Sequence, residues 1–274
     1  YTPKSIVNLI AEMIEPYRGK IYDPCCGSGG MFVQSMKFVE NHQGNRKDIS
    51  VYGQEGTSTT LKLAKMNLAI RGIAANLGEK ADDTFASDQH KDLKADFIMA
   101  NPPFNQKDWR AADELTNDPR WAGYEVPPTG NANYGWILHM VAKLSENGLA
   151  GFILANGALS GDNTEKEIRK KLIENHLVEA VLILPRNMFY TTDISVTLWI
   201  LNKNKKTRTV DYGGLKRHYR NRENEILFMD LRETGEPFEK KYIQFSEAHI
   251  QQIARTYHSW QQVEADKNYR NIPE

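Results

Sequence analysis

Four consecutive residues, Asn101-Pro102-Pro103-Phe104, follow an apolar run and combine an amide, two prolines and an aromatic ring. The two prolines stiffen the backbone and remove two N–H donors, so the carbonyls there point outward as acceptors. The Asn101 side chain and the Pro102 carbonyl could then hold an exocyclic amine with its lone pair directed at a methyl sulfonium. Phe104 would stack on the base that carries the amine. A purely structural Asn-Pro-Pro turn is the alternative.

A glycine-rich segment, residues 23–30 (DPCCGSGG), lies between a predicted strand and a predicted helix. This is the carboxyl edge at which open α/β sheets bind ligands. Glycines let a ligand approach the backbone, and the helix that follows supplies unpaired N–H groups. Neither the Gly-Lys-Ser/Thr of a phosphate loop nor the G-x-G-x-x-G of a dinucleotide site is present. The segment is therefore either a ligand-binding loop of another type or a glycine turn without a ligand.

Glu55 ends the next predicted strand, residues 50–55. An acid at this place characteristically accepts hydrogen bonds from the ribose hydroxyls of a nucleoside bound against the first strand. A glutamate that caps the following helix is the competing explanation. The glycine loop upstream favours ribose binding.

The hydrophobic pattern predicts the elements that position these residues. Strands and helices alternate, which indicates a parallel sheet. The connection before the strand at 195–201 is too short for a crossover helix, so that strand should pair antiparallel with its predecessor. The predicted strands are 20–23, 50–55, 76–78, 96–100, 149–155, 178–184, 195–201 and 226–231. The first predicted helix carries apolar residues at helical spacing from Ile6 to Ile14 and is stopped by Pro16 and Gly19, and the other predicted helices are 29–40, 57–71, 136–146, 164–175 and 246–262.

A long stretch with little regular patterning, from Asn105 to about Gly135, follows the Asn-Pro-Pro-Phe motif. Structureless stretches of that length are uncommon in compact domains and usually carry function or disorder. We therefore expect a lid or a segment that contacts a partner.

Charge and composition restrict the partners. The chain has 274 residues, 40% hydrophobic content and a formal net charge of zero, which suits one principal α/β domain but is unusual for a protein that holds nucleic acid by itself. Residues 203–222 hold eight Lys or Arg and one acid, so they form either a phosphate-contacting loop or a solvated basic loop.

No apolar run approaches the ~20 residues of a membrane span, and the first residues lack the basic-then-apolar pattern of a secretory signal. A cytoplasmic location is therefore expected.

The two cysteines are adjacent, at Cys25 and Cys26. Adjacent cysteines are poorly placed for a structural disulfide and cannot form a two-site metal clip. Small buried residues are therefore expected here, and no metal is predicted.

The glycine loop, Glu55 and the Asn-Pro-Pro-Phe motif, in this order, resemble the amino-methyltransferases of DNA, and most closely the modification subunit of Type I restriction-modification systems. The resemblance covers residues 1 to about 260. It implies transfer of a methyl group from S-adenosylmethionine to the exocyclic amine of adenine in DNA. It also implies a Rossmann-like α/β fold, with a mostly parallel seven-stranded sheet whose last strand is antiparallel, as the catalytic domain (1–203), followed by a C-terminal extension (204–274).

The resemblance also assigns roles to individual residues. Asp83 would lie near the adenine amine of the cofactor, although Asp82 stands where the family has glycine. Phe189, with Tyr190 as second choice, would pack on the flipped target base together with Phe104. The implied cofactor-binding residues are Tyr1, Thr2, Pro3, Lys4, Asp23, Cys25, Cys26, Gly27, Ser28, Gly29, Glu55 and Asp83, and the implied catalytic residues are Asn101, Pro102, Pro103 and Phe104.

The partners follow from the same resemblance. Such enzymes act on double-stranded DNA and extrude the target nucleotide, because the adenine amine is engaged in pairing. In the family a specificity subunit reads the sequence and a restriction subunit joins it, with two modification subunits for each specificity subunit. Relatives carry a further helical domain upstream, so the resemblance implies that this chain is a fragment. No general base is assigned, and the seven histidines are interpreted as incidental.

Two other functions are compatible with the motif. Asn-Pro-Pro followed by an aromatic residue also serves enzymes that methylate a glutamine amide of a protein or the exocyclic amine of an RNA base. The long stretch after Phe104 favours DNA. A cofactor-binding scaffold without catalysis is the alternative from a different class, and the intact motif at Asn101 disfavours it.

Overall fold

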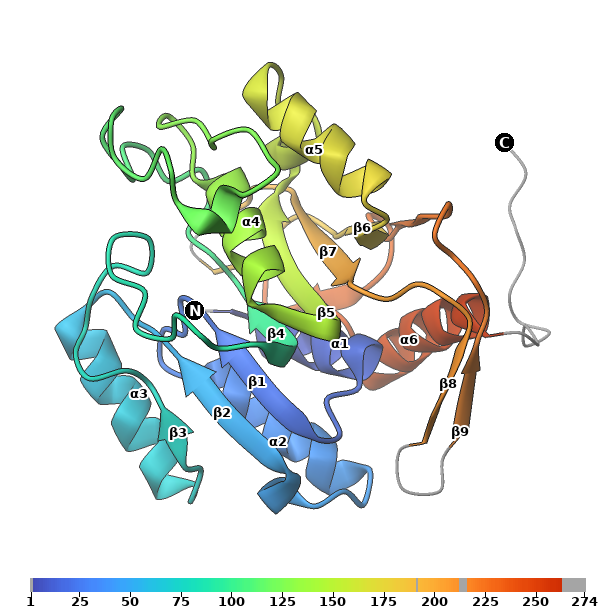
Figure 1. The fold of residues 1–274 in the computed structure, drawn as a ribbon. Helices are drawn as coiled ribbons and strands as arrows, with labels where there is room; N and C mark the ends of the chain where they lie inside the picture. Colours follow the sequence, from blue (N-terminus) through green and yellow to red (C-terminus); the bar gives the residue numbers. More distant parts are fainter. Residues whose placement is uncertain (1, 191, 212–215, 263–274) are drawn as a thin grey trace.

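The computed structural model describes residues 2–190, 192–211 and 216–262, and its centre is one eight-stranded sheet with helices against both faces (Figure 1). The strand order is β10-β6-β7-β5-β4-β1-β2-β3. The bounds are β1 Gly19–Asp23, β2 Ile49–Gly53, β3 Ala75–Asn76, β4 Ala95–Ala100, β5 Leu144–Ala155, β6 Val178–Ile183, β7 Val196–Asn202 and β10 Leu227–Asp230.

The pairing within the sheet confirms the predicted class. Strand β7 pairs antiparallel with both β5 and β6, whereas the other strand pairs of the sheet are parallel. The first seven strands form the expected sheet with its reversed last member. The sheet has one strand more than the predicted seven, because β10 of the C-terminal extension adds itself in parallel to the edge at β6.

Two hydrophobic cores lie on the two faces of the sheet. Helices α1 (Lys4–Ile14), α2 (Gly30–Asn41), α3 (Ser58–Ile70) and α6 (Glu247–Gln261) contribute to one core. Helices α4 (Asn133–Lys143) and α5 (Thr164–Glu174) contribute to the other. The central strands are buried on both faces, which explains their continuous apolar sequences.

Some predicted boundaries were wrong, most clearly those between α4 and β5. The helix expected over 136–146 ends at Lys143, and β5 begins at Leu144 rather than at Leu149. Leu144 pairs with Ala95 beside an irregularity in the β4 ladder, so pairing with a neighbouring strand overrides the helical pattern of these residues.

The segment that follows the Asn-Pro-Pro-Phe motif, residues 105–132, is called the long loop here. It contains only one short 3₁₀ turn, η2 (Pro119–Trp121). It is nevertheless anchored, because Trp109 and Trp121 are buried against Phe85, with ring centroids 4.3 and 6.5 Å from it. The long loop is therefore a packed part of the domain in this structure.

The C-terminal extension packs against the sheet domain. The β8 (Arg208–Asp211) and β9 (Lys216–Tyr219) strands form a hairpin, followed by β11 (Glu236–Phe238), β12 (Tyr242–Gln244) and α6. Helix α6 lies against α1, and the ring of His258 bonds to the Glu12 carbonyl oxygen. A domain boundary at residue 203 stays a prediction.

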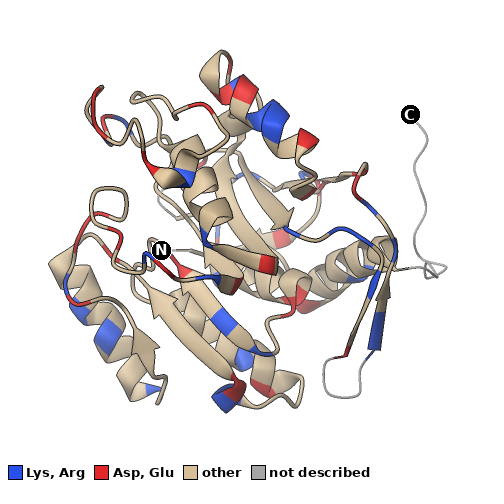
Figure 2. Ribbon diagram, viewed as in Figure 1, with Lys and Arg blue, Asp and Glu red and all other residues tan. Residues whose placement is uncertain are grey.

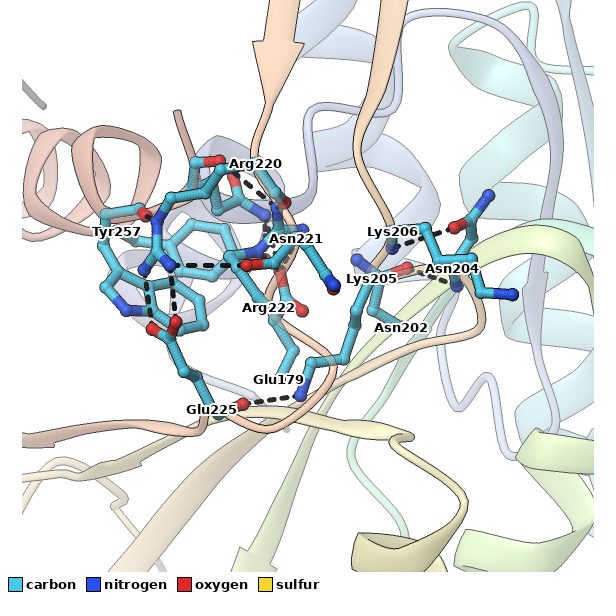
Figure 3. A network of polar contacts seen from close by, with 12 residues as sticks. Glu179, Asn202, Asn204, Lys205, Lys206, Arg220, Asn221, Arg222, Glu225 and Tyr257 are labelled. Carbon is cyan, nitrogen blue, oxygen red and sulfur yellow. Dashed lines mark hydrogen bonds and ion pairs between the residues drawn. The ribbon is translucent and has the colours of Figure 1, made fainter. Parts of the chain in front are cut away.

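Several cations of the basic stretch 203–222 are engaged within the chain. Arg217 forms an ion pair with Glu15. Arg220 and Arg222 form ion pairs with Glu225 and Glu179, respectively (Figure 3). Lys205 donates to the carbonyls of Val178 and Glu225. These four side chains hold the extension in place, and positive and negative residues are interspersed over the ribbon (Figure 2). Any contact of this stretch with phosphate would therefore have to come from its other cations.

Candidate active site

The three predicted motifs meet at one edge of the sheet. Asp23 ends β1, Glu55 follows the end of β2 by two residues, and Asn101 comes directly after β4. Strand β1 pairs with both β2 and β4 in parallel, so the carboxyl ends of all three lie side by side (Figure 1). The sheet topology thus brings together residues that are up to 78 positions apart (101 − 23) in the sequence.

The glycine loop between β1 and α2 turns with left-handed backbone at Gly27 (φ 52°) and Gly29 (φ 77°). The Cys26 N–H donates to the Gln54 carbonyl at 2.9 Å, and the Gly27 N–H donates to Glu55 Oε2 at 3.0 Å. A Cβ at Gly27 would have no neighbouring heavy atom within 4 Å. Space therefore lies open beside the backbone of this loop, as a ligand cradle requires.

Both carboxylate oxygens of Glu55 are used within the chain. Oε2 accepts from Gly27, and Oε1 accepts from the N–H of Thr57 at 2.9 Å, the N-cap residue of α3. The capping alternative is thus observed for one oxygen. Since each oxygen can accept two hydrogen bonds, Glu55 keeps acceptor capacity toward ribose hydroxyls, and that role stays a prediction.

Asn101 holds the most informative polar atom of the site. Its Nδ2 donates to Thr2 Oγ1 at 2.9 Å, which orients the amide. Its Oδ1 is buried and has no hydrogen-bond partner among the described residues. Leaving a buried acceptor unpaired costs about 1–3 kcal/mol, so a ligand that donates an N–H or O–H to this oxygen would be stabilised here.

The following residue extends this acceptor set. Pro102 is buried, and no described residue donates a hydrogen bond to its carbonyl oxygen. Pro103 is exposed at the cavity wall. The motif therefore presents two acceptors beside two prolines that lack N–H groups, and its role toward an amine stays a prediction.

Two cavities meet at this motif. One of about 730 Å³ is lined by the glycine loop together with Thr2, Lys4 and Asp23. The other, of about 450 Å³, is lined by Glu55 and Asp83 together with the Asn-Pro-Pro-Phe motif and Phe189. Cys25 and Asn101 line both. The cavities are of the size of small-molecule sites.

Two residues near the start of the chain, Thr2 and Lys4, lie beside this site. Thr2 contacts Asn101, and Lys4 lines the larger cavity. Pro3 is the N-cap residue of α1, with its carbonyl accepting from Ile6. Tyr1 lies outside the described residues.

Asp83 holds a tight turn at the rim of the smaller cavity. Its Oδ1 accepts from the N–H groups of Phe85 and Ala86, both at 2.8 Å. The hydroxyl of Thr84 donates to the Pro24 carbonyl at 2.6 Å, which connects the turn to the glycine loop. Asp82, where the resemblance expects glycine, pairs with Lys80 at the surface.

Phe104 and Phe189 touch each other. Their ring centroids are 5.8 Å apart and their planes form an angle of 84°, an edge-to-face contact. Phe189 is buried, whereas Tyr190 is half exposed and packs on Tyr242. The predicted pair is thus brought together, but not as two parallel plates with a base-wide slot between them.

Gln54 is a site residue that sequence reasoning missed. It is fully buried, and its Nε2 donates to the carbonyls of Asp82 and Ser87. Its Oε1 accepts from the Gln89 N–H, so one side chain fixes the segment that carries Asp83. The only signal in the sequence was a polar residue at the end of an apolar strand.

Burial changes the acid–base properties of the glycine loop. Desolvation raises the pKa of Asp23 to about 7, with the nearby Glu55 charge as a smaller cause in the same direction. Desolvation also raises the pKa of the Cys25 and Cys26 thiols, so both stay protonated at neutral pH. The thiols are therefore poor nucleophiles here.

The Asp23 carboxyl should make stability depend on pH. Between about 4 and about 7 the unfolded chain has lost this proton while the folded chain retains it, so stability falls as pH rises, by about 1.4 kcal/mol per pH unit. The contribution is fully present below pH 4. Urea unfolding of the wild type and of Asp23→Asn from pH 4 to 8 measures this, and the variant should show a flatter profile. Parallel profiles for the two proteins would contradict the assignment.

The fold and the site together define a class. A mostly parallel sheet with a reversed β7, a glycine loop after β1, an acid after β2 and Asn-Pro-Pro-Phe after β4 constitute a Rossmann-like methyltransferase. The chain belongs to the N-6 DNA methylase family, whose model matches residues 1–272. S-Adenosylmethionine is the cofactor of this family.

Known proteins similar to this chain include methylase subunits of Type I restriction enzymes. The HindI methylase subunit of Haemophilus influenzae is 48% identical over 262 residues, which cover 95% of this chain and 55% of that protein. The MjaIX methylase subunit of Methanocaldococcus jannaschii is 36% identical, covering 99% of this chain and 47% of that protein. The chain spans about half the length of these relatives.

A solved structure shows the same arrangement. The type I restriction-modification system methyltransferase subunit from Streptococcus thermophilus superimposes with a TM-score of 0.78 at 26% identity, covering 94% of this chain and 52% of that one. Among the described residues, no helix is both long and apolar enough to cross a bilayer.

Proposed function

We propose that this chain is the catalytic part of the modification subunit of a Type I restriction-modification enzyme and methylates the exocyclic amine of adenine in double-stranded DNA. The observation that carries the proposal is the buried Asn101 Oδ1 without a donor, beside the Pro102 carbonyl. An exocyclic amine supplies two N–H donors, which match these two acceptors.

The residues present fit S-adenosylmethionine, which supplies a methyl group on a positively charged sulfur. The acceptors of Glu55 and Asp83 suit a nucleoside part in the smaller cavity. Gly27, which has open space beside it, lines the larger cavity. Asp23, Thr2 and Lys4 line the larger cavity, which suits the amino acid part. The methyl group belongs where the cavities join, beside Asn101.

The motif acts on the amine by geometry. With both N–H groups held by Asn101 Oδ1 and the Pro102 carbonyl, the nitrogen lone pair stands away from the base plane and is available to the methyl carbon. The bound cofactor would supply the methyl group to this nitrogen, and the methylated amine would lose one proton to solvent. We assign no general base to this step.

The target base must leave the duplex, which costs a few kcal/mol of unstacking. Phe104 and Phe189 would recover part of that cost by stacking on the extruded adenine. Since the two rings meet edge to face, at least one of them must turn to present its face to the base.

The wider assembly is part of the proposal. The chain would act in the cytoplasm with a specificity subunit that reads DNA and a restriction subunit, as two modification subunits for each specificity subunit. Residues 1–203 would form the catalytic domain and 204–274 an extension packed on it. The likeness to methylase subunits of Type I enzymes supports this reading.

Calorimetric titration with S-adenosylmethionine tests the cofactor site. Glu55→Ala should weaken binding about 10- to 100-fold, the size expected for lost hydrogen bonds to a charged group and a loosened glycine loop. The matched control is Glu79→Ala, an exposed glutamate that lines neither cavity, which should bind as the wild type does.

Methyl transfer tests the substrate. Tritiated methyl groups should appear on duplex DNA in the assembled enzyme, and not on protein glutamine or RNA. Label on protein glutamine or on RNA would show that this alternative substrate, and not DNA, is methylated. Cofactor binding without transfer to any acceptor would support the alternative of a non-catalytic scaffold.

A further inference from the structure

Arg120, in the middle of the long loop, makes hydrogen bonds with all of its guanidinium N–H groups. Nε and Nη2 donate to the two oxygens of Asp118 at 2.8 and 2.7 Å. Nη1 donates to the Thr84 carbonyl at 3.0 Å, and Nη2 donates to the Phe85 carbonyl at 2.6 Å. The fifth N–H faces His139 Nδ1 at 3.2 Å. A guanidinium has five donors, so its capacity is used completely.

The two carbonyls belong to the turn that carries Asp83. Asp83 Oδ1 already closes this turn from inside, through the N–H groups of Phe85 and Ala86. The Arg120 guanidinium holds the same turn from outside, through its carbonyls. The Asp83 carboxylate can keep its orientation toward the smaller cavity only while this backbone stays in place.

The other contacts make Arg120 rigid. Its side chain is 9% exposed and lies over the ring of Trp121 at 5.1 Å from the centroid. Because Arg120 only donates, His139 Nδ1 accepts, so the ring is neutral and its Nε2–H donates to Tyr22 Oη at 3.0 Å. Burial, together with the charge of Arg120, lowers the pKa of His139 to about 3, in agreement with a neutral ring. The network ends at the Tyr22 hydroxyl, on the strand β1 that leads into the glycine loop.

We propose that Arg120 is a positioning residue of the cofactor site, through which the long loop holds the Asp83 turn in the geometry that recognises the adenine of the cofactor. This inference rests on the proposed function. It makes the long loop a structural requirement for cofactor affinity, rather than only a segment near the DNA or a partner.

The long loop offers a matched control in Arg110. This side chain also lies over a tryptophan, Trp109, at 5.4 Å, and also donates to backbone carbonyls. All its carbonyl acceptors, however, belong to the long loop itself: Ala111, Ala112, Glu114 and Pro127. Arg110→Met therefore removes hydrogen bonds within the loop and none to the carbonyls of the Asp83 turn.

The test is calorimetric titration of the wild type, Arg120→Met, Arg120→Lys and Arg110→Met with S-adenosylmethionine. Arg120→Met should raise the Kd at least about 10-fold while the stoichiometry stays near one, and Arg120→Lys should fall between it and the wild type. Arg110→Met should stay within about threefold of the wild type. The loss should be equal with 5′-methylthioadenosine, which lacks the amino acid part.

Other outcomes overturn the inference. An unchanged Kd for Arg120→Met, an equal loss for Arg110→Met, or a loss confined to S-adenosylmethionine would each do so. A reduced stoichiometry at unchanged Kd would show only a fraction of misfolded chains, and thus a purely structural role. If Arg120→Met does not fold, Arg120→Lys carries the same comparison. No binding by the folded wild type would instead contradict the proposed function.

Discussion

Replacing Asn101 by alanine should lower the rate of methyl transfer roughly 100- to 1000-fold, the range measured when one pre-positioned polar group is removed from a reacting centre. The reason is that Oδ1 of Asn101 is a buried acceptor, which we propose holds the incoming amine. The Kd for S-adenosylmethionine should stay within about threefold, since in the proposed function other residues, Glu55 among them, hold the nucleoside part. Single-turnover transfer of tritiated methyl groups to duplex DNA by the assembled enzyme, together with calorimetry, measures both quantities.

Thr2→Val provides a second arm for this prediction. The variant keeps the Asn101 amide but removes the acceptor of its Nδ2, which is 2.9 Å away in the wild type. The amide then loses its fixed orientation, and we expect a rate about 10-fold lower, closer to the wild type than Asn101→Ala is. A normal rate in Asn101→Ala, or a loss of transfer explained entirely by lost cofactor binding, would show that Asn101 does not hold the amine.

The second large effect concerns stability. Arg222→Met should lower the free energy of unfolding by about 3–5 kcal/mol, because removing one partner of a buried ion pair leaves the other charge uncompensated. Arg222 is 1% exposed and Glu179 is fully buried (Figure 3). Arg222 also lies between the rings of Tyr219 and Trp260, each 5.6 Å from its guanidinium carbon. Guanidinium-induced unfolding measures the loss.

Two further variants make this prediction specific. The double variant Arg222→Met with Glu179→Leu should recover most of the loss, because it removes the stranded carboxylate. Arg232→Met removes an exposed arginine paired with Asp230 and should leave the unfolding midpoint unchanged. Equal destabilisation by Arg222→Met and Arg232→Met would mean that burial of the pair is irrelevant.

The same ion pair explains how the C-terminal extension is held. Glu179 lies on β6, whereas Arg222 follows β9, and Gln261 at the end of α6 donates to the same Glu179 oxygen at 2.8 Å. The buried Glu179 carboxylate thus connects β6 to two other segments of the chain. We expect the extension and the sheet to unfold together for this reason.

Local patterns in the sequence were sufficient for the fold class and for placing the three candidate motifs at the ends of strands. Apolar runs and helical spacing predicted the order of strands and helices as far as β7, and a short connection predicted the reversal of that strand. Strands β8, β9, β11 and β12 of the extension were not predicted. The segment 23–30, Glu55 and Asn101 each follow a strand, so their meeting at one edge follows from parallel pairing alone. These features depend on residues that are neighbours in sequence, which is why they can be read without a structure.

Only the tertiary structure decided how the site is supported. Asn101 donates to Thr2, 99 residues away, and Arg120 donates to carbonyls 36 and 35 residues before it. The edge-to-face contact of Phe104 with Phe189, and the added strand β10, likewise depend on how distant segments pack. No periodicity or turn signal encodes such contacts, because each is selected by the shape and hydrogen-bonding needs of a partner far along the chain. The sequence by itself therefore determined which residues lie at the carboxyl edge of the sheet. The tertiary packing decided which distant side chains contact them.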